Sequence, residues 1–310
     1  MAFQQEVPAE MIAAMCRRAF GAATTVIRAT KIGVGTWNDT YRVEIADRGP
    51  VILRVAPSPE RDEREAMRNE YAAAPYFAAL GPLVPRTLYA DFTHQLIGRD
   101  YMLQEPLPGV PAADRLNAYP DLTPYFRQLG TITRTIHNVR GVRFGPVAAA
   151  TFATWSEALA DQFQTLADAY DRAGLDAGEV RRIRAAVDTH RAVLDEVREP
   201  RLLHGDLWRL NILIDPDAPE PAIVGILDYD GASWGDPLAD WTIHQVLRRE
   251  GTEAFWETYG PRPAEPIRQL FYQARCLAGA RLDIYRRNID LATVPPVHWD
   301  LTDVLKGLDA

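Results

Sequence analysis

The sequence has few of the features that would place it outside ordinary globular proteins. Only two of the 310 residues are cysteine, Cys16 and Cys276, and they lie far apart in no metal-ligand spacing. This scarcity argues against a disulfide framework and predicts inert thiols in a reducing compartment. No run approaches the 18 apolar residues of a membrane span, and the N-terminus lacks a basic region followed by an apolar core. We therefore expect a cytoplasmic protein without a membrane partner.

Positive charge is also in short supply. Lys and Arg total 34 against 42 Asp and Glu, which gives a net charge of -8. A nucleic-acid partner would favour a basic face, so we expect none, whereas an acidic surface suits a cationic small molecule. The hydrophobic fraction of 47% is ordinary, and the chain is long enough for two lobes with separate cores.

The most informative stretch is the one around Asp206. His204, Asp206 and Asn211 follow one another as H-x-D-x-x-x-x-N, and a second acidic element with Asp228 comes shortly after. Phosphoryl transfer needs a carboxylate that orients the attacking hydroxyl, and an amide and a further carboxylate that hold Mg²⁺ on the phosphates. Asp206, Asn211 and Asp228 supply that set in the required order.

Two strand-like runs carry the proposed metal ligands. Residues 212–214 and 223–227 are apolar, and the Asp-Pro-Asp turn at 215–217 lies between them. This pattern predicts a hairpin. A single Asp in such a place could merely cap a turn, but the ordered set favours a kinase-type site.

The same stretch resembles the aminoglycoside phosphotransferase family, which shares the protein-kinase fold. The spelling H-G-D-L-W at 204–208, L-D-Y at 227–229 and W-G-D-P at 234–237 carries the resemblance. A protein kinase would show Arg where Gly205 stands, and Phe-Gly after its metal-binding Asp. The resemblance covers nearly the whole chain but is specific only in residues 31–55 and 201–241.

The resemblance implies an α+β, bilobal, protein-kinase-like fold. Residues 1–105 would form a small nucleotide-binding lobe with a five-stranded antiparallel sheet and a helix. Residues 106–310 would form a larger, mostly helical lobe that carries the catalytic and acceptor-binding residues, with a helical insertion at about 150–200.

The expected strands of the small lobe begin with a glycine-containing turn. Strands are predicted at 24–32, 40–45 and 51–55, and Gly33, Gly35 and Asn38 lie in the first turn. Backbone N–H groups in such a flap can face phosphate oxygens. A plain hairpin is the alternative, but the turn resembles the nucleotide loop of the family, in which Asn commonly replaces the third Gly of protein kinases.

Arg54 stands on the third strand, where protein kinases place a phosphate-binding Lys. An Arg offers a planar, permanently charged fork that can bridge a phosphate and a carboxylate. The family's basic–acidic pair suggests Glu70 as that carboxylate, in a helix predicted at about 60–80. Lys31 is the alternative phosphate ligand.

Strands at 85–90 and 100–103 would complete the small lobe, and a Pro-rich stretch follows at 104–109. It resembles the hinge, where the backbone at Glu105 and Leu107 would pair with the adenine edge. A linker without any ligand is the alternative.

The rest of the chain is predicted to be mostly helical, with amphipathic stretches at 125–137, 152–170 and 179–197. His137 is expected to be structural, and Asp236 and Asp240 resemble family residues that brace the catalytic loop. The tail is rich in aromatic residues, most of which should be core.

Together these features predict a small-molecule kinase that uses Mg²⁺ with ATP or GTP. Asp206 would orient or accept the proton of the acceptor hydroxyl, Asn211 and Asp228 would hold metal, and His204 would orient the loop. The negative charge favours an amine-bearing antibiotic or amino sugar. Kinases of fructosamine, homoserine, choline or sugars share these motifs and remain alternatives, as does a non-catalytic nucleotide-binding protein.

Overall fold

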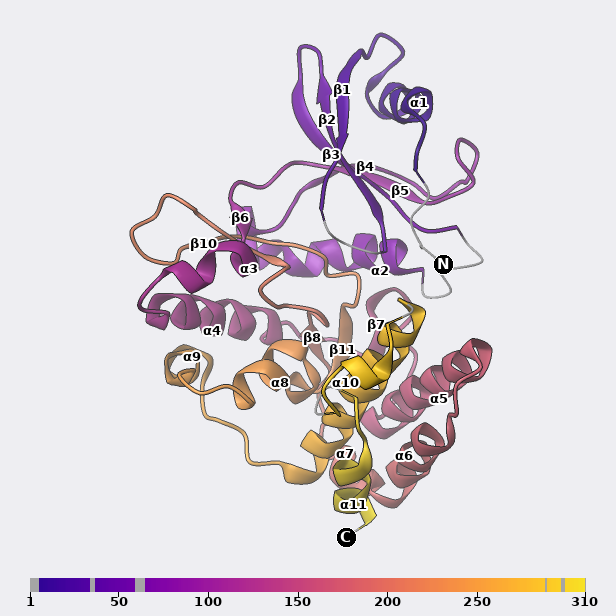
Figure 1. Ribbon diagram of the computed structural model, residues 1–310, viewed down its shortest axis with the longest axis vertical. Coiled ribbons are helices and arrows are strands. Elements are labelled where there is room, and N and C mark those ends of the chain that lie inside the picture. The colour runs from indigo at the N-terminus through magenta and orange to yellow at the C-terminus, as the bar shows by residue number, and fades with distance from the viewer. Residues whose placement is uncertain (1–5, 34–36, 59–64, 288, 297–298, 310) are drawn as a thin grey trace. The chain divides into compact units, whose positions relative to one another are not determined.

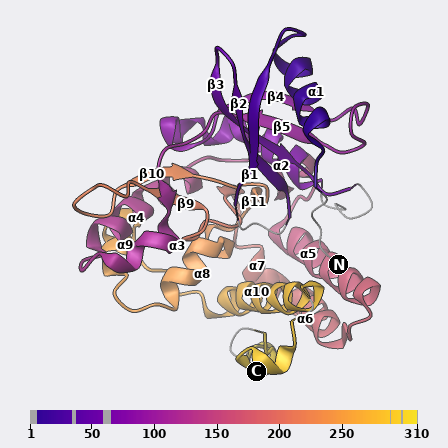
Figure 2. The ribbon, with the colours of Figure 1, turned by 45° about the horizontal axis from the view of Figure 1, so that its top comes forward.

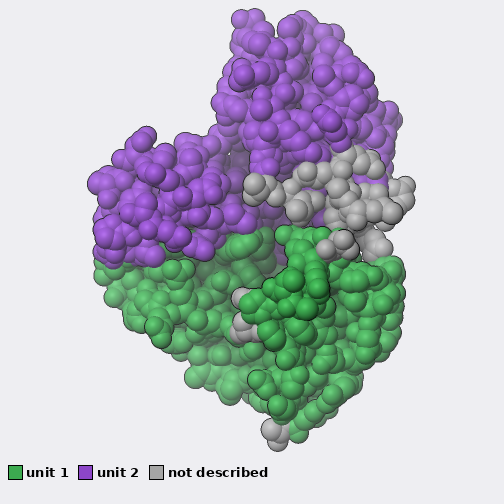
Figure 3. All heavy atoms as spheres, viewed as in Figure 1, with its two compact units in different colours: residues 1, 123–208, 232–310 green, residues 2–122, 209–231 purple. Residues whose placement is uncertain are grey.

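The computed structural model describes residues 6–33, 37–58, 65–287, 289–296 and 299–309. The chain divides into two compact units (Figure 3). One comprises residues 2–122 and 209–231, here called the sheet unit, and the other comprises residues 123–208 and 232–310, here called the helical unit. The predicted division between residues 105 and 106 stays a prediction.

The sheet unit contains the predicted five-stranded antiparallel sheet, in the order β1-β2-β3-β5-β4 (Figure 1). The fold class inferred from the sequence is thereby confirmed. Its elements are α1 (Ala9–Phe20), β1 (Val26–Lys31), β2 (Asp39–Ile45), β3 (Gly49–Val55), α2 (Ala66–Ala73), the 3₁₀ segment η1 (Ala74–Leu83), β4 (Thr87–Asp91), β5 (Tyr101–Gln104), β6 (Val110–Pro111), α3 (Ala112–Arg115), η2 (Leu116–Ala118), β9 (Ile212–Ile214) and β10 (Ile223–Ile226).

Strand alternation decides which side chains of β3 reach the functional side of the sheet. Leu53 and Val55 are fully buried in a cluster with Met15 and Cys16 of α1. Because successive side chains point to opposite faces of a strand, Arg54 between them points to the other face. There it meets a residue of α2 rather than the apolar cluster of α1.

The helix predicted at about 60–80 is not a single helix. Residues 59–64 lie outside the described residues, α2 covers Ala66–Ala73, and the chain continues as 3₁₀ turns in η1. Pro75 accounts for the change, because it has no N–H group to continue the α-helical hydrogen bonds. Glu70 nevertheless lies on the α-helical part, as expected.

The hairpin predicted at 212–227 is confirmed. β9 and β10 pair antiparallel, with Ile212 opposite Ile226. The two-residue strand β6, which the sequence did not predict, adds to β9 as a third strand. The segment that carries Asn211 and Asp228 therefore belongs to the sheet unit.

The helical unit also holds a small sheet, in the order β7-β11-β8. Its elements are α4 (Thr123–His137), β7 (Gly145–Pro146), η3 (Val147–Ala149), α5 (Trp155–Ala173), α6 (Gly178–Thr189), α7 (Arg191–Leu194), β8 (Arg201–Leu203), β11 (Ser233–Gly235), η4 (Pro237–Ala239), α8 (Trp241–Leu247), α9 (Glu253–Tyr259), α10 (Pro266–Arg286), η5 (Leu291–Thr293) and α11 (Thr302–Asp309). The helix predicted at 179–197 is interrupted at His190, which separates α6 from α7.

The helices of this unit pack in pairs. α4 packs on α9, and α5 contacts both α6 and α10 (Figure 2). Phe255, Phe271 and Tyr272 of the aromatic tail are buried as predicted, whereas Tyr285 is 46% exposed. Over the described ranges, no helix is both long and apolar enough to cross a membrane.

Candidate active site

Three predicted site residues form a continuous chain of contacts in the sheet unit. Arg54 Nη1 donates to both carboxylate oxygens of Glu70, at 2.5 and 2.6 Å. Its other terminal nitrogen, Nη2, donates to Asp228 Oδ1 at 2.5 Å. β3, α2 and the segment after β10 thus meet through one guanidinium, although Asp228 is 174 residues from Arg54.

Burial of Arg54 and Glu70 changes the pKa values of both side chains. Arg54 is 9% exposed and Glu70 only 1%, whereas the Asp228 side chain is 39% exposed. Burial opposes the charge on Arg54, but the carboxylates of Glu70, Asp228 and Asp230 raise its pKa further above the ordinary value. Burial raises the pKa of Glu70, and the charge of Arg54 counteracts this. Because guanidinium remains protonated in proteins, Arg54 carries its positive charge in this buried position.

The two predicted metal ligands flank the hairpin, with Asn211 just before β9 and Asp228 just after β10. Leu227 N–H donates to the Asn211 carbonyl at 2.8 Å, which places Asn211 beside the residue that precedes Asp228. Asp228 itself has a φ of +63°. Non-glycine residues rarely adopt this left-handed conformation, and such outliers concentrate at functional sites.

The structure describes only part of the predicted nucleotide loop. Gly33 follows β1 with a φ of +84°, Asn38 directly precedes β2, and Gly35 lies outside the described residues. The buried Asp39 anchors the second strand by accepting from Lys31 at 2.8 Å and from Arg99 at 2.6 Å. The Lys31 ammonium is thus engaged by Asp39, as the Arg54 guanidinium is by Glu70 and Asp228, and the preference for Arg54 as phosphate ligand stays a prediction.

The predicted hinge connects β5 to β6. Glu105 N–H donates to the Arg86 carbonyl at 2.9 Å, and the two side chains form an exposed ion pair. Leu107 packs over Gly225 of β10, where an added Cβ would lie 3.0 Å from Leu107 Cδ1. The predicted pairing of this backbone with adenine stays a prediction.

The predicted catalytic loop around Asp206 begins in the helical unit, where Asp240 braces it as expected. Asp240 accepts the backbone N–H groups of His204 and Gly205, both at 2.9 Å. Gly205 has a φ of +86°, which explains the glycine at this position. His204 is fully buried, and its Nδ1 lies 3.3 Å from the Asp206 backbone nitrogen, so it contacts the loop backbone.

His137 supports the same carboxylate from the core. Its Nε2 lies 3.0 Å from Asp240 Oδ2, and its Nδ1 lies 2.8 Å from the Tyr259 hydroxyl. Burial by itself would raise the pKa of Asp240, but the contacts from His137 and His204 lower it to about 2. Asp240 therefore remains ionised and holds the loop, and His137 has the structural place predicted for it.

Sequence reasoning missed two polar residues beside the Arg54–Glu70 pair. Gln104 Nε2 donates to Glu70 Oε1 at 3.3 Å, and Asn69 Nδ2 donates to the Asp230 carbonyl at 2.8 Å. Both side chains are buried. The sequence did contain a signal for each residue. Gln104 is the polar residue at the end of the otherwise apolar strand β5, and Asn69 is the polar residue directly before Glu70 in α2.

The donor set fits a magnesium ion. Asn211 and Asp228 provide oxygen ligands, and Mg²⁺ usually takes one or two protein carboxylates together with phosphate oxygens and water. Across the described part of the chain, no group of three or more His, Cys, Asp or Glu side chains forms a metal site on its own. A magnesium site in which nucleotide phosphates supply the remaining ligands would fit both the two side-chain oxygen donors and the lack of such a group among the described residues.

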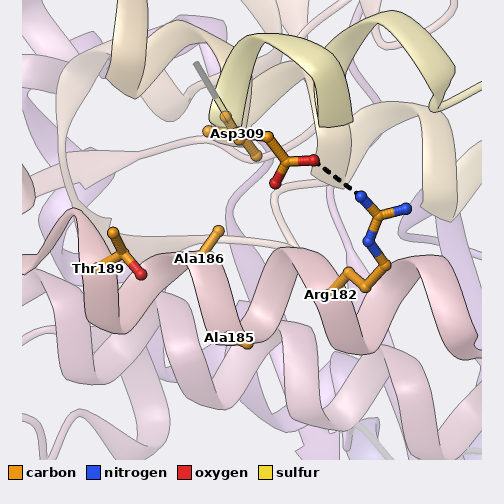
Figure 4. A pocket seen from close by; sticks show the side chains of 6 residues that line it. Arg182, Ala185, Ala186, Thr189 and Asp309 are labelled. Carbon is orange, nitrogen blue, oxygen red and sulfur yellow. Dashed lines mark hydrogen bonds and ion pairs between the residues drawn. The ribbon is translucent and has the colours of Figure 1, made fainter.

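A surface hollow of about 400 Å³ lies elsewhere, between α6 and α11 (Figure 4). Arg182 and Asp309 form an ion pair of 2.8 Å at its rim, and two alanines of α6 line its floor. None of the predicted site residues lines it.

Comparison with known proteins identifies relatives at the level of family and fold. The chain matches the model of the phosphotransferase enzyme family over residues 28–270. No curated protein sequence matches it.

Solved structures resemble the whole chain. The GDP and kanamycin complex of an aminoglycoside 2″-phosphotransferase has a TM-score of 0.64 at 16% identity, covering 96% of this chain and 98% of that one. A protein from Thermobifida fusca described as a fructosamine-3-kinase has a TM-score of 0.64 at 18% identity, and the match covers 97% of this chain and 99% of that one. The ADP and hygromycin B complex of aminoglycoside phosphotransferase APH(4)-Ia has a TM-score of 0.62 at 15% identity, and the match covers 96% of this chain and 97% of that one. At these identities the likeness establishes the fold.

Proposed function

Because this chain belongs to the phosphotransferase enzyme family and has its kinase-like fold, we propose that it is a small-molecule kinase. It transfers the γ-phosphate of ATP or GTP, with Mg²⁺, to a hydroxyl group of an amine-bearing antibiotic or amino sugar. The acceptor assignment rests on the net charge of -8, which favours a cationic molecule.

The contact of Arg54 with both Glu70 and Asp228 carries this proposal. A buried guanidinium held by a buried carboxylate is a pre-organised phosphate ligand, and its second contact lies on the proposed metal ligand. One guanidinium would then serve both the nucleotide and the metal site. This supports a phosphate-binding role more strongly than a purely structural ion pair.

In the proposed mechanism, Asp206 orients the acceptor hydroxyl and accepts its proton as the oxygen attacks the γ-phosphorus. Such positioned acid–base groups contribute about 10²–10⁴-fold in rate. The bond from the γ-phosphorus to the β,γ-bridging oxygen breaks, and the nucleoside diphosphate leaves with that oxygen. His204 Nδ1 accepts the Asp206 backbone N–H, and Asp240 accepts the backbone N–H groups of His204 and Gly205 just before it. Arg54 binds phosphate oxygens.

Asn211 and Asp228 are the residues that would hold Mg²⁺. The bound ion supplies neutralisation of the charge on the phosphate oxygens. The backbone N–H groups of Gly33 and Asn38 contact the phosphates, and the backbone at Glu105 and Leu107 pairs with the base.

The decisive experiment measures nucleoside diphosphate release with MgATP and MgGTP against aminoglycosides, macrolides, peptide antibiotics, amino sugars, choline and homoserine. Asp206→Asn is the matched control, because it keeps the side-chain shape but removes the base. An acceptor-dependent signal that falls at least about 100-fold in Asp206→Asn supports the proposal.

Two results would argue against it. Wild-type turnover by a folded Asp206→Asn protein on a true acceptor would remove Asp206 from the mechanism. Nucleotide binding without transfer to any acceptor would favour a non-catalytic nucleotide-binding protein.

A kinase of glycated amines is the second candidate. The structure described as a fructosamine-3-kinase resembles this chain as well as the kanamycin-bound enzyme does, with a TM-score of 0.64 in each case. Adding fructosyl-lysine to the panel separates the two candidates, since an antibiotic kinase would leave it unmodified.

A further inference from the structure

Asn69 connects α2 to the segment that follows the proposed metal ligand. Its side-chain Nδ2 donates to the Asp230 carbonyl at 2.8 Å, and the residue is only 6% exposed. The two residues are 161 positions apart, so the contact is a product of the fold rather than of local sequence. Asp230 is two residues beyond Asp228.

The backbone at Asp228 requires support from its surroundings. A φ of +63° is unfavourable for a residue with a Cβ, so it persists only where neighbouring contacts enforce it. Before Asp228, the Leu227 N–H is fixed by the Asn211 carbonyl at 2.8 Å. After it, the Asp230 carbonyl is fixed by Asn69.

The intervening residue is anchored by packing. Tyr229 is 1% exposed, and its ring stacks on Phe77 of η1, with centroids 4.5 Å apart. Phe77 belongs to the same stretch of chain that begins with α2. Successive residues from 227 to 230 are therefore each held, and Asn69 provides the hydrogen bond on the C-terminal side.

Asn69 also stands next to Glu70 in the sequence. Glu70 reaches the side chain of Asp228 through Arg54, whereas Asn69 reaches the backbone beyond it. Adjacent residues of one helix thus control the direction of the Asp228 carboxylate and the conformation of its main chain. The two routes are independent, because they use different atoms of the segment.

From this geometry we propose that Asn69 is a positioning residue that keeps Asp228 in its metal-binding conformation by holding the Asp230 carbonyl. The inference rests on the proposed function, because it takes Asp228 as a magnesium ligand. Residues that orient metal ligands from outside typically contribute about 10–100-fold to metal affinity.

The test compares metal binding by Asn69→Leu with that of wild type. Leucine has a similar size but cannot donate to the Asp230 carbonyl. Mn²⁺ is titrated in the presence of ADP and followed by its electron paramagnetic resonance signal, so the readout does not depend on turnover. Binding of ADP in EDTA is measured separately. We expect the Mn²⁺ dissociation constant to rise about tenfold or more, with little change in metal-free ADP affinity.

Two further variants separate positioning from stability. Thr133→Val removes another buried hydrogen bond, from Thr133 Oγ1 to the Leu129 carbonyl at 2.7 Å in the helical unit. It should lower the melting temperature but leave the Mn²⁺ affinity unchanged. Asn69→Ser, whose hydroxyl is too short to reach Asp230, repeats the test with a smaller side chain if the leucine variant does not fold.

Each outcome bears on the proposal. Mn²⁺ affinity that equals wild type in a folded Asn69 variant overturns the positioning role and leaves the proposed function standing. If the wild-type protein binds no Mn²⁺ with ADP, the proposed function fails, and the inference fails with it. Selective loss of Mn²⁺ affinity in the Asn69 variants, but not in Thr133→Val, supports the inference.

Discussion

Arg54 makes two kinds of contact that a lysine could not reproduce together. Its fork donates twice to Glu70 from one nitrogen and once to Asp228 from the other. A lysine has one ammonium group on a flexible stem, so a change from Arg to Lys at such a site is not conservative. The sequence alone left open whether Arg54 or Lys31 binds phosphate.

We expect Arg54→Lys to raise the KM for MgATP about tenfold, because the charge remains while the geometry is lost. Arg54→Met should lower kcat/KM about 100-fold, and it should also destabilise the fold by about 3–5 kcal/mol because the buried Glu70 loses its cationic partner and keeps only the hydrogen bond from Gln104. Steady-state kinetics and urea denaturation measure the two effects. Arg42→Met, on the exposed side of β2, is the control and should leave both unchanged. Equal kinetics for Arg54→Met and Arg42→Met would contradict the role.

His244 provides a pH-dependent prediction at the same scale. Its burial, together with the charges of Arg248 and Arg275, lowers its pKa from 6.5 to about 4. Between these values the unfolded chain takes up a proton that the folded protein does not, so stability falls as pH decreases from 6.5 to about 4. The loss amounts to at most about 3 kcal/mol.

His244→Gln should flatten this part of the stability profile, as measured by urea denaturation over the same pH range. Gln245→Ala, on the exposed neighbour in α8, keeps the histidine and should retain the slope. An unchanged slope in His244→Gln would assign the acid sensitivity to other groups.

At the scale of elements, the sequence predicted most of the strands and helices, and the family resemblance implied how they assemble. The five strands and α4 occur close to the residues at which they were expected, and the 212–227 hairpin follows from its turn residues. Local breaks were harder to foresee. Pro75 changes the helix type after α2, and His190 interrupts the helix predicted at 179–197.

The sequence predicted those residues of the candidate site that belong to a recognisable motif. The order of Asp206, Asn211 and Asp228 indicated the chemistry, and a family pattern paired Arg54 with Glu70. The support given by Asn69 was not visible, because it depends on a side chain that meets a backbone carbonyl 161 residues away. The left-handed backbone of Asp228 was equally hidden, since residue type alone indicates it only for glycine.

The start of α5 carries a complete capping box. Thr154 Oγ1 accepts the Glu157 N–H at 3.3 Å, and the Glu157 carboxylate accepts the Thr154 N–H at 3.2 Å. We expect Thr154→Ala to lower the free energy of unfolding by about 1 kcal/mol. Thr165→Ala, at an exposed position in the middle of the same helix, is the matched control and should change stability by less than about 0.5 kcal/mol. Urea denaturation distinguishes the two, and equal effects would argue against the cap.

At the scale of the whole molecule, the two compact units are interleaved in sequence. The chain passes between them at residues 122/123, 208/209 and 231/232. The sheet unit therefore obtains its β9–β10 hairpin from a stretch far from its other elements. That hairpin supplies the strand partner of β6, the stacking partner of Phe77 and the carboxylate that contacts Arg54.

We expect a fragment of residues 1–122 to show no cooperative urea transition, because β6, Phe77 and Arg54 all lose partners. The full chain should unfold cooperatively under the same conditions. Circular dichroism during urea titration compares them. A fragment that unfolds with a sharp transition would show that the hairpin is dispensable to the sheet unit.

The boundary between the two units at Trp208 and Arg209 limits which sequence changes relatives of this protein can tolerate. Asp206 belongs to one unit and Asn211 to the other, although only a short stretch of chain separates them. Substitutions at 207–210 change a side chain and keep the number of residues between Asp206 and Asn211, whereas an inserted or deleted codon changes the length of chain that connects the two units. Natural variation in this stretch should therefore consist of replacements, and recombination that exchanges an entire unit between relatives would require several crossovers rather than one.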